Sequence, residues 1–184
     1  MDFFTADLHF FHRRLAELRG FDNCVDEMND TLVRNWNNKV ARGDRVFILG
    51  DFSFGKMAET VAITSKLNGQ LFLVRGNHDS MKECKANPHF SWVKDYEFMK
   101  APCGTYISMS HFPMLVWNKS HYGSWHLHGH SHGNLRLPPG MEKARTFDVG
   151  VDNVERLGGT LAPVTFEEIV SLRGEVGDVQ LDHH

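Results

Sequence analysis

Candidate metal ligands follow five separate apolar segments of this 184-residue chain. They occur in the short blocks DLH, GD, GNHD, SH and GHSH. These ligands are carboxylates, imidazoles and one amide, a set without thiolate that suits Mn²⁺, Fe or Zn²⁺ better than Ca²⁺. Each block alone is a weak signal, but their joint occurrence after apolar segments predicts a metal centre. The metal-type residues in these blocks are Asp7, His9, Asp51, Asn77, His78, Asp79, His111, His130 and His132.

The stretch WHLHGHSHG, residues 125–133, places a histidine at every second position. A regular strand would line these four imidazoles along one face. That arrangement is costly unless a ligand binds the rings or water reaches them. The stretch therefore raises the question of which of its histidines hold a ligand.

The first half of the chain alternates between strand-like and helix-like segments. Strands are expected over 1–6, 45–51 and 71–74, and helices from a cap at Asp26 to about residue 41 and over 56–67. This alternation implies parallel strands joined by right-handed crossovers. Asp7, Asp51 and Asn77 then lie side by side at the carboxyl ends of their strands, where open α/β sheets bind ligands.

The second half reads as strands connected by loops. GTYISMSH, WHLHGH and RTFDVGVD are strand-like, and segments 113–124 and 133–145 carry the Pro, Gly and Asn of surface loops. Thr165 and Glu168 form a capping-box sequence that opens a short helix over 167–172. We expect a single α/β domain over residues 1–184, with two sheets packed face to face and helices outside.

Composition favours a cytoplasmic protein that does not enter membranes. The chain has no apolar run approaching the roughly 18 residues that span a bilayer, and its first residues do not resemble a secretory signal. A net charge of −3 argues against broad attraction to nucleic acid or membranes. The scattered Cys24, Cys84 and Cys103 are expected to be reduced thiols. The final His183 and His184 are consistent with a purification tag and receive no role.

The order DxH, GD, GNHD, H, GHxH resembles the signature of the calcineurin-like metallophosphoesterase superfamily. The resemblance covers residues 1 to about 152 and is greatest for small, single-domain members of bacteria and their phages, through DLHFFH, RGF and Asn35-Trp36-Asn37. It implies a four-layer αββα sandwich with two mixed sheets. It also implies two divalent metal ions, Mn²⁺ foremost and Fe, Zn²⁺ or Ni²⁺ as alternatives.

The resemblance also assigns the ligands. Two cations roughly 3.5–4 Å apart would hold a bridging hydroxide that attacks the phosphoryl group, and a shared carboxylate would offset their repulsion. The implied ligands are Asp7, His9 and His132 for the first metal, Asn77, His111 and His130 for the second, and Asp51 for both.

Further residues of these motifs are expected to act on the substrate. His78 matches the family's non-ligand histidine and would stabilise charge or protonate the leaving oxygen, with Asn77 also near the phosphate. Asp79 would orient the ring of His78 or, alternatively, cap the stretch that follows it. His12 would approach the phosphate or pack locally, and Arg75 would clamp the substrate or pair with a surface carboxylate.

The remaining polar residues have structural interpretations. His126 and His128 lie outside the GHxH match and are expected to be buried and hydrogen-bonded, whereas Gly129 permits a bend that lets His130 and His132 reach the metals. Asp148 and Asp152 are expected to be structural, with Asp148 bonded to a ligand histidine or a loop. The loop residues Trp117, Asn118, Lys119, His121 and Tyr122 would rim the site, with Trp117 as core filler the alternative, and His89 would lie on the surface.

The leading hypothesis is a dinuclear metal-dependent phosphoesterase that favours phosphodiesters. The chain has no room for a cap domain that would enclose a small monoester, and few arginines surround the motifs to grip a dianion. Candidate substrates are cyclic nucleotides, nucleotide derivatives and nucleic-acid ends, so nucleic acid enters only as a substrate. The alternatives are a phosphomonoesterase acting on nucleotides or phosphoproteins and a non-catalytic scaffold, which the complete ligand set disfavours.

Overall fold

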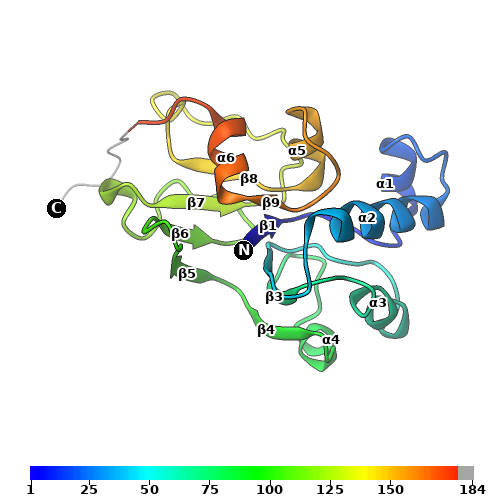
Figure 1. The fold of residues 1–184 in the computed structure, drawn as a ribbon. Coiled ribbons are helices and arrows are strands. Elements are labelled where there is room, and N and C mark those ends of the chain that lie inside the picture. Colours follow the sequence, from blue (N-terminus) through cyan, green and yellow to red (C-terminus); the bar gives the residue numbers. More distant parts are fainter. Residues whose placement is uncertain (178–184) are drawn as a thin grey trace.

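Two mixed β-sheets pack face to face in the computed structural model, which describes residues 1–177, and helices surround them (Figure 1). This arrangement confirms the predicted α/β class and the pair of sheets. His183 and His184 lie outside the described residues. Within residues 1–177, every helix is too short or too polar to span a bilayer.

The first sheet has the strand order β4-β3-β2-β1-β9. Its strands are β1 (Asp2–Thr5), β2 (Arg45–Ile48), β3 (Gln70–Val74), β4 (Phe90–Lys94) and β9 (Val164–Thr165). The first four are parallel, as expected for strands separated by helices, and β9 pairs antiparallel with β1. The helices between these strands are α1 (Arg13–Leu18), α2 (Val25–Lys39), α3 (Met57–Thr64) and α4 (Met81–Ala86).

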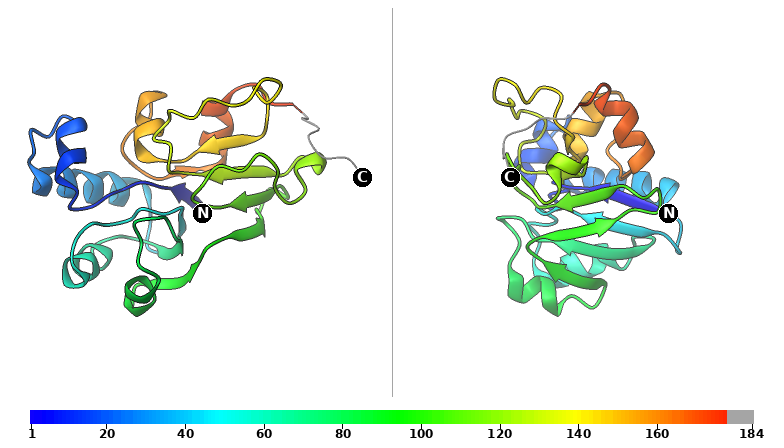
Figure 2. Two further views of the ribbon diagram at one scale, coloured as in Figure 1. Left: turned by 180° about the vertical axis from the view of Figure 1, so that it is seen from behind. Right: turned by 90° about the vertical axis from the view of Figure 1, so that its left-hand side faces the viewer.

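The second sheet has the order β5-β6-β7-β8. Its strands are β5 (Glu97–Lys100), β6 (Tyr106–Met109), β7 (Trp125–His128) and β8 (Thr146–Asp148). The β6-β7 and β7-β8 pairs are parallel, and β5 is antiparallel to β6. Each sheet therefore contains parallel strands whose carboxyl ends lie along one edge. A 3₁₀ turn, η1 (Ser120–Tyr122), lies in the loop before β7, and α5 (Val151–Arg156) and α6 (Phe166–Arg173) lie on the side of β8 and β9 (Figures 1 and 2).

Side-chain alternation along the strands divides the core into two main layers. Phe3 and Val46 pack under the helices with Leu32 and Trp36 of α2. The next residue of β1, Phe4, points the other way, into a layer formed between the two sheets, where it stacks on Phe47. Because one face of the first sheet meets helices and the other meets a sheet, the central residues of β1, β2 and β3 are apolar on both faces.

Helix boundaries mostly follow the predicted signals. The capping box is confirmed, since the Thr165 hydroxyl accepts from the backbone N–H of Glu168 while the Glu168 carboxylate accepts from the N–H of Thr165. The prediction that Asp26 caps α2 is wrong, because the helix begins at Val25 and Cys24 occupies the cap position. Asp26 lies instead in the first turn, where its charge favours the helix dipole.

Candidate metal centre

The carboxyl ends of strands from both sheets meet at one rim. Asp7 follows β1, Asp51 follows β2 and Asn77 follows β3, while His111 and His130 follow β6 and β7 of the second sheet. Backbone hydrogen bonds join these ends: the N–H of Asp7 donates to Gly50 and the N–H of Gly129 donates to His111, both at 3.0 Å. The fold thus gathers segments that are far apart in the sequence.

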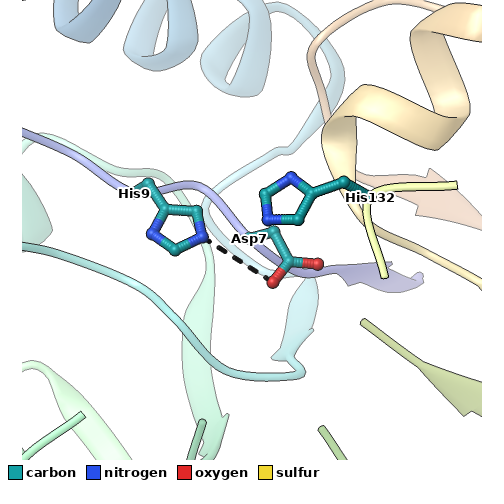
Figure 3. Close-up of side chains that lie close together, drawn as sticks. All are labelled: Asp7, His9 and His132. Carbon is teal, nitrogen blue, oxygen red and sulfur yellow. Dashed lines mark ion pairs between the residues drawn. The ribbon is translucent and has the colours of Figure 1, made fainter. Parts of the chain in front are cut away.

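A first group of possible ligands consists of Asp7, His9 and His132, each of which offers an atom within 4.8 Å of the others' (Figure 3). His9 Nε2 lies 3.9 Å from Asp7 Oδ1. The rings of His9 and His132 stack with their centroids 5.2 Å apart. This group matches the three residues that the sequence assigned to the first metal.

A second group consists of Asp7, Asp51 and His111, again with ligand atoms within 4.8 Å of one another. His111 Nδ1 lies 2.8 Å from the carbonyl oxygen of Leu49, which only accepts, so this nitrogen carries a proton. In the neutral ring, Nε2 then presents its lone pair 3.0 Å from Asn77 Oδ1 and 3.5 Å from Asp51 Oδ2. These three acceptor atoms lie close enough together to bind one cation jointly.

His130 is more exposed than these residues and lies beside them. Its ring centroid is 5.1 Å from that of His111, and its backbone N–H donates to Asp7 Oδ2 at 2.9 Å. His130 is absent from both close groups of ligand atoms, although it was assigned to the second metal. The ring of His130 therefore lies near the second group, but it is not one of the residues whose ligand atoms lie within 4.8 Å of one another.

Unpartnered buried atoms test whether a cation fits. Among residues 1–177, Asp7 Oδ1 and both ring nitrogens of His9 are buried without a hydrogen-bond partner. Leaving such a group unsatisfied costs about 1–3 kcal/mol. Burial lowers the pKa of His9 to about 2, so the ring is neutral, the form that binds metals. Burial also raises the pKa of Asp7 well above its usual value, with Asp148 and Asp51 adding repulsion, and a cation would offset both costs. These residues fit a metal.

The backbone at the candidate ligands is strained. Positive φ angles occur at five of them, a conformation that costs non-glycine residues about 1–3 kcal/mol each. Such strain persists where the surrounding structure imposes it, and it clusters at functional sites. The residues are Asp7 (φ 55°), His9 (φ 49°), Asp51 (φ 52°), His130 (φ 69°) and His132 (φ 46°).

Two motif glycines allow the segments to approach. A Cβ atom at Gly76 would lie 2.2 Å from Asp51 Oδ1, and one at Gly129 would lie 2.7 Å from Asp7 Oδ2 and 2.5 Å from Ala6 Cβ. Any side chain at these positions would push the carboxylates out of place. The glycines of GNHD and GHSH are therefore required by close contact, which adds to the bend predicted at Gly129.

Asp79 does not hold the ring of His78, so the predicted orienting role is wrong. Its carboxylate accepts from the backbone N–H groups of Gly76 and Asp51 at 2.8 Å and of Phe52 at 3.0 Å. The alternative, a helix cap, is wrong as well, because Ser80 caps α4. Asp79 instead ties the loop after β3 to the loop after β2, and so fixes the position of Asp51.

Asp152 has a role that the sequence did not reveal. Its Oδ2 lies 2.6 Å from His132 Nδ1, and its carboxylate pairs with the guanidinium of Arg19 at 2.7 and 2.9 Å. Arg19, which is almost fully buried, also donates to the backbone oxygen of Asp7 at 2.7 Å. Burial opposes ionisation of Asp152, but Arg19 and His132 hold its pKa well below the usual value. Arg19 belongs to the RGF segment, the one signal for this network in the sequence.

Asp148 binds a loop, the second of the two alternatives. Its carboxylate accepts from the Ser131 hydroxyl at 2.9 Å and from the N–H groups of Gly133 and Gly150 at 2.8 Å. These bonds fix the turn that carries His132.

The residues assigned to the substrate have different positions. The side chain of His78 is 48% exposed, and its Nε2 lies 3.9 Å from Asp51 Oδ2. His12 packs locally: its Nδ1 accepts from the N–H of Leu15 at 3.2 Å and caps α1. Arg75 pairs with the exposed carboxylate of Asp95 at 2.8 Å, the second alternative considered for it.

The interpretation of His126 and His128 as buried, hydrogen-bonded rings is confirmed. His126 accepts from the N–H of Met114 at 3.0 Å, and His128 Nδ1 lies 3.0 Å from the carbonyl oxygen of Gly129. Trp117 is buried and stacks on His126, so it fills a small core and does not rim the site. His89 is exposed, as expected. The thiols of Cys24, Cys84 and Cys103 are free.

No family model matches the chain. Its relatives include an uncharacterized protein of Methanocaldococcus jannaschii, 31% identical over 176 residues, 92% of this chain and 89% of that protein. The Gene 66 proteins of Mycobacterium phages L5 and D29 are 29% and 30% identical, covering 84% and 81% of this chain and 87% and 86% of their own lengths.

Among solved structures, a protein of unknown function from Aquifex aeolicus shares the fold with a TM-score of 0.66 and 22% identity, over 94% of this chain and 98% of that one. The chain belongs to the family that contains the Methanocaldococcus jannaschii protein and the Gene 66 protein of phage D29.

Proposed function

We propose that this protein is a dinuclear metal-dependent phosphoesterase that hydrolyses phosphodiesters. The observation that carries the proposal is the pair of ligand groups that share Asp7, together with buried atoms of Asp7 and His9 that have no partner in the part of the chain that the structure describes. Two adjacent divalent cations supply Lewis acidity toward phosphoryl oxygens and lower the pKa of water. Mn²⁺ suits the imidazole and carboxylate donors.

In this proposal the ligands keep the division expected from the motifs. Asp51 belongs to the second group and also approaches the first, since its Oδ2 is 3.5 Å from His111 Nε2 and 3.7 Å from His9 Nε2. A carboxylate in this position can bridge two cations. The proposed ligands are Asp7, His9 and His132 for the first metal, Asn77, His111 and His130 for the second, and Asp51 for both.

His78 is proposed to hold a proton at Nε2 for the leaving oxygen. Its backbone N–H donates to Asp51 Oδ1 at 2.9 Å, which fixes the residue beside the centre while its ring stays half-exposed. A ring that reaches both solvent and the centre can exchange its proton after each turnover. Asn77, the preceding residue, is proposed to contact the phosphate as well.

The preference for diesters follows from the charges around the centre. Arg19 and Arg75, which adjoin the motifs, are paired with Asp152 and Asp95. Neither guanidinium is therefore available to neutralise the second negative charge of a monoester without breaking an ion pair. A phosphodiester carries one negative charge, which two cations can match.

The test compares two chromogenic substrates. Metal-reconstituted protein with Mn²⁺ is expected to hydrolyse bis(p-nitrophenyl) phosphate with a higher kcat/KM than p-nitrophenyl phosphate. The variant Asp51→Ala is expected to lose bound metal and activity together, whereas Asp30→Ala, on the exposed face of α2, serves as the matched control. A large preference for the monoester would overturn the diester assignment. Absence of hydrolysis of either ester would overturn the proposed function.

A further inference from the structure

Two half-exposed phenylalanines lie against the candidate ligands. Phe54 is 43% exposed and Phe112 is 50% exposed. Exposed phenylalanine rings leave apolar surface in water, and both of these rings contact histidines of the candidate centre. Each one is held by backbone hydrogen bonds: the N–H of Phe54 donates to Phe10 at 2.8 Å, and the carbonyl of Phe112 accepts from the Ser110 hydroxyl at 2.6 Å.

Phe54 packs on histidines in the segments that follow β1 and β3. Its ring centroid lies 4.3 Å from that of His12, 4.7 Å from that of His78 and 5.3 Å from that of His9. These contacts fix the ring next to the residue proposed to protonate the leaving oxygen. The exposed part of the ring therefore adjoins the leaving-group side of the centre.

Phe112 packs on the histidines that follow the second sheet. Its ring centroid lies 4.7 Å from that of His130 and 5.1 Å from that of His111. Asp51 connects the two sets of histidines, because its Oδ2 lies 3.9 Å from His78 Nε2, beside Phe54, and 3.5 Å from His111 Nε2, beside Phe112. The two phenylalanines thus adjoin the centre from different groups of ligands.

We infer that Phe54 and Phe112 are stacking residues for two nucleobases, one on each organic substituent of a phosphodiester bound at the centre. The inference rests on the proposed function and names its substrate class, a phosphodiester that links two nucleosides. A monoester has one organic substituent and would use one ring. Stacking of a base on an aromatic side chain contributes about 1–3 kcal/mol, and it tolerates different bases because every base has a π-face.

The experiment uses the metal-loaded protein and a substrate series. The substrates are thymidylyl-(3′→5′)-thymidine, the two analogues that lack one base, and the analogue that lacks both. In the wild type, removal of each base is expected to raise KM about 5- to 150-fold. In Phe54→Leu and in Phe112→Leu, one of the two bases should no longer matter. The KM of the analogue that lacks this base, divided by the KM of the substrate with both bases, is expected to fall toward one. Each substitution should affect a different base.

Two further variants separate stacking from a packing role. Phe54→Tyr and Phe112→Tyr keep an aromatic face and are expected to restore the KM ratio. Leu157→Ala, a half-exposed apolar residue at the end of α5, is the control and should leave the ratio unchanged. Cleavage of all four substrates by the wild type with equal KM would overturn the inference and leave the proposed function intact. Failure to cleave bis(p-nitrophenyl) phosphate as well would overturn the proposed function.

Discussion

The stretch WHLHGHSHG contains two regions, a strand and a turn, in which histidine has different roles. His126 and His128 lie within β7 and are buried, with ring nitrogens that meet backbone groups. His130 and His132 lie beyond the strand at positive φ, and their rings turn toward the carboxylates and histidines of the rim. The difference teaches that backbone conformation, more than residue type, separates a structural imidazole from one that can bind a ligand.

The two regions also differ in how their polar atoms are satisfied. The strand histidines have partners within the protein, whereas the turn lies beside His9 and Asp7, whose buried atoms have none. Changes in the turn should therefore alter metal binding and activity, and changes in the strand should alter stability.

The largest effect is expected for His132→Ala. Loss of a proposed ligand should reduce metal affinity by more than the 10–100-fold that follows loss of a residue supporting a ligand, and phosphodiesterase activity should fall with it. Metal content by mass spectrometry and turnover of bis(p-nitrophenyl) phosphate check this prediction. His126→Gln is the matched control within the same stretch, and equal metal loss in both variants would remove the distinction between the regions.

His78→Ala tests a histidine that is exposed like those of the turn but is not a proposed ligand. Turnover should slow about 10²–10⁴-fold, the usual contribution of a positioned acid, while both metals stay bound. Metal stoichiometry measured alongside kcat decides the result. A drop in stoichiometry as large as that of His132→Ala would make His78 a ligand.

Asp152→Asn tests the turn indirectly, because Asp152 contacts His132 but is not itself a proposed ligand. The substitution weakens the bonds that orient His132 and pair Arg19, so metal affinity should fall about 10–100-fold. Titration of the metal-free protein with Mn²⁺ measures this effect. Glu175→Gln, which disrupts a surface pair with Lys143, provides the control. Unchanged affinity would show that His132 does not need this support.

The strand region is expected to leave metal binding unchanged and to show its effect as a dependence of stability on pH. Burial lowers the pKa of His126 to about 3, against about 6.5 in an unfolded chain. Between these values the unfolded chain binds a proton that folded His126 does not. The free energy of unfolding should therefore fall as the pH drops from about 6.5 to 3, by at most about 1.4 kcal/mol per pH unit.

Urea unfolding of the metal-free protein across this range, compared with His126→Gln, isolates this contribution. The variant should lose part of the slope, and His89→Gln, at an exposed position, should retain it. An identical slope in His126→Gln and the wild type would contradict the assignment.

The parts of the fold that the sequence predicted best were those with a local signal. The parallel strands of the first half, the loops around β7 and the capping box at Thr165 follow from apolar runs and short motifs. The short helices α1, α4 and α5 carry too few periodic residues to be recognised. Asp26 misled the prediction because an acidic residue suits both a cap and the first turn.

The resemblance that the motif blocks carry named the proposed ligands, and the same match separated the two pairs of histidines in WHLHGHSHG. Only the tertiary structure showed which hydrogen bonds and ion pairs the residues around these ligands form. Asp79 binds three backbone N–H groups and not a ring, and Arg75 faces Asp95. Asp152 pairs with Arg19, 133 positions away in the sequence, and also with His132. Ligand types are set by local chemistry, which a motif records. A hydrogen bond between distant segments depends on where the packed sheets place each backbone, and no local pattern encodes that.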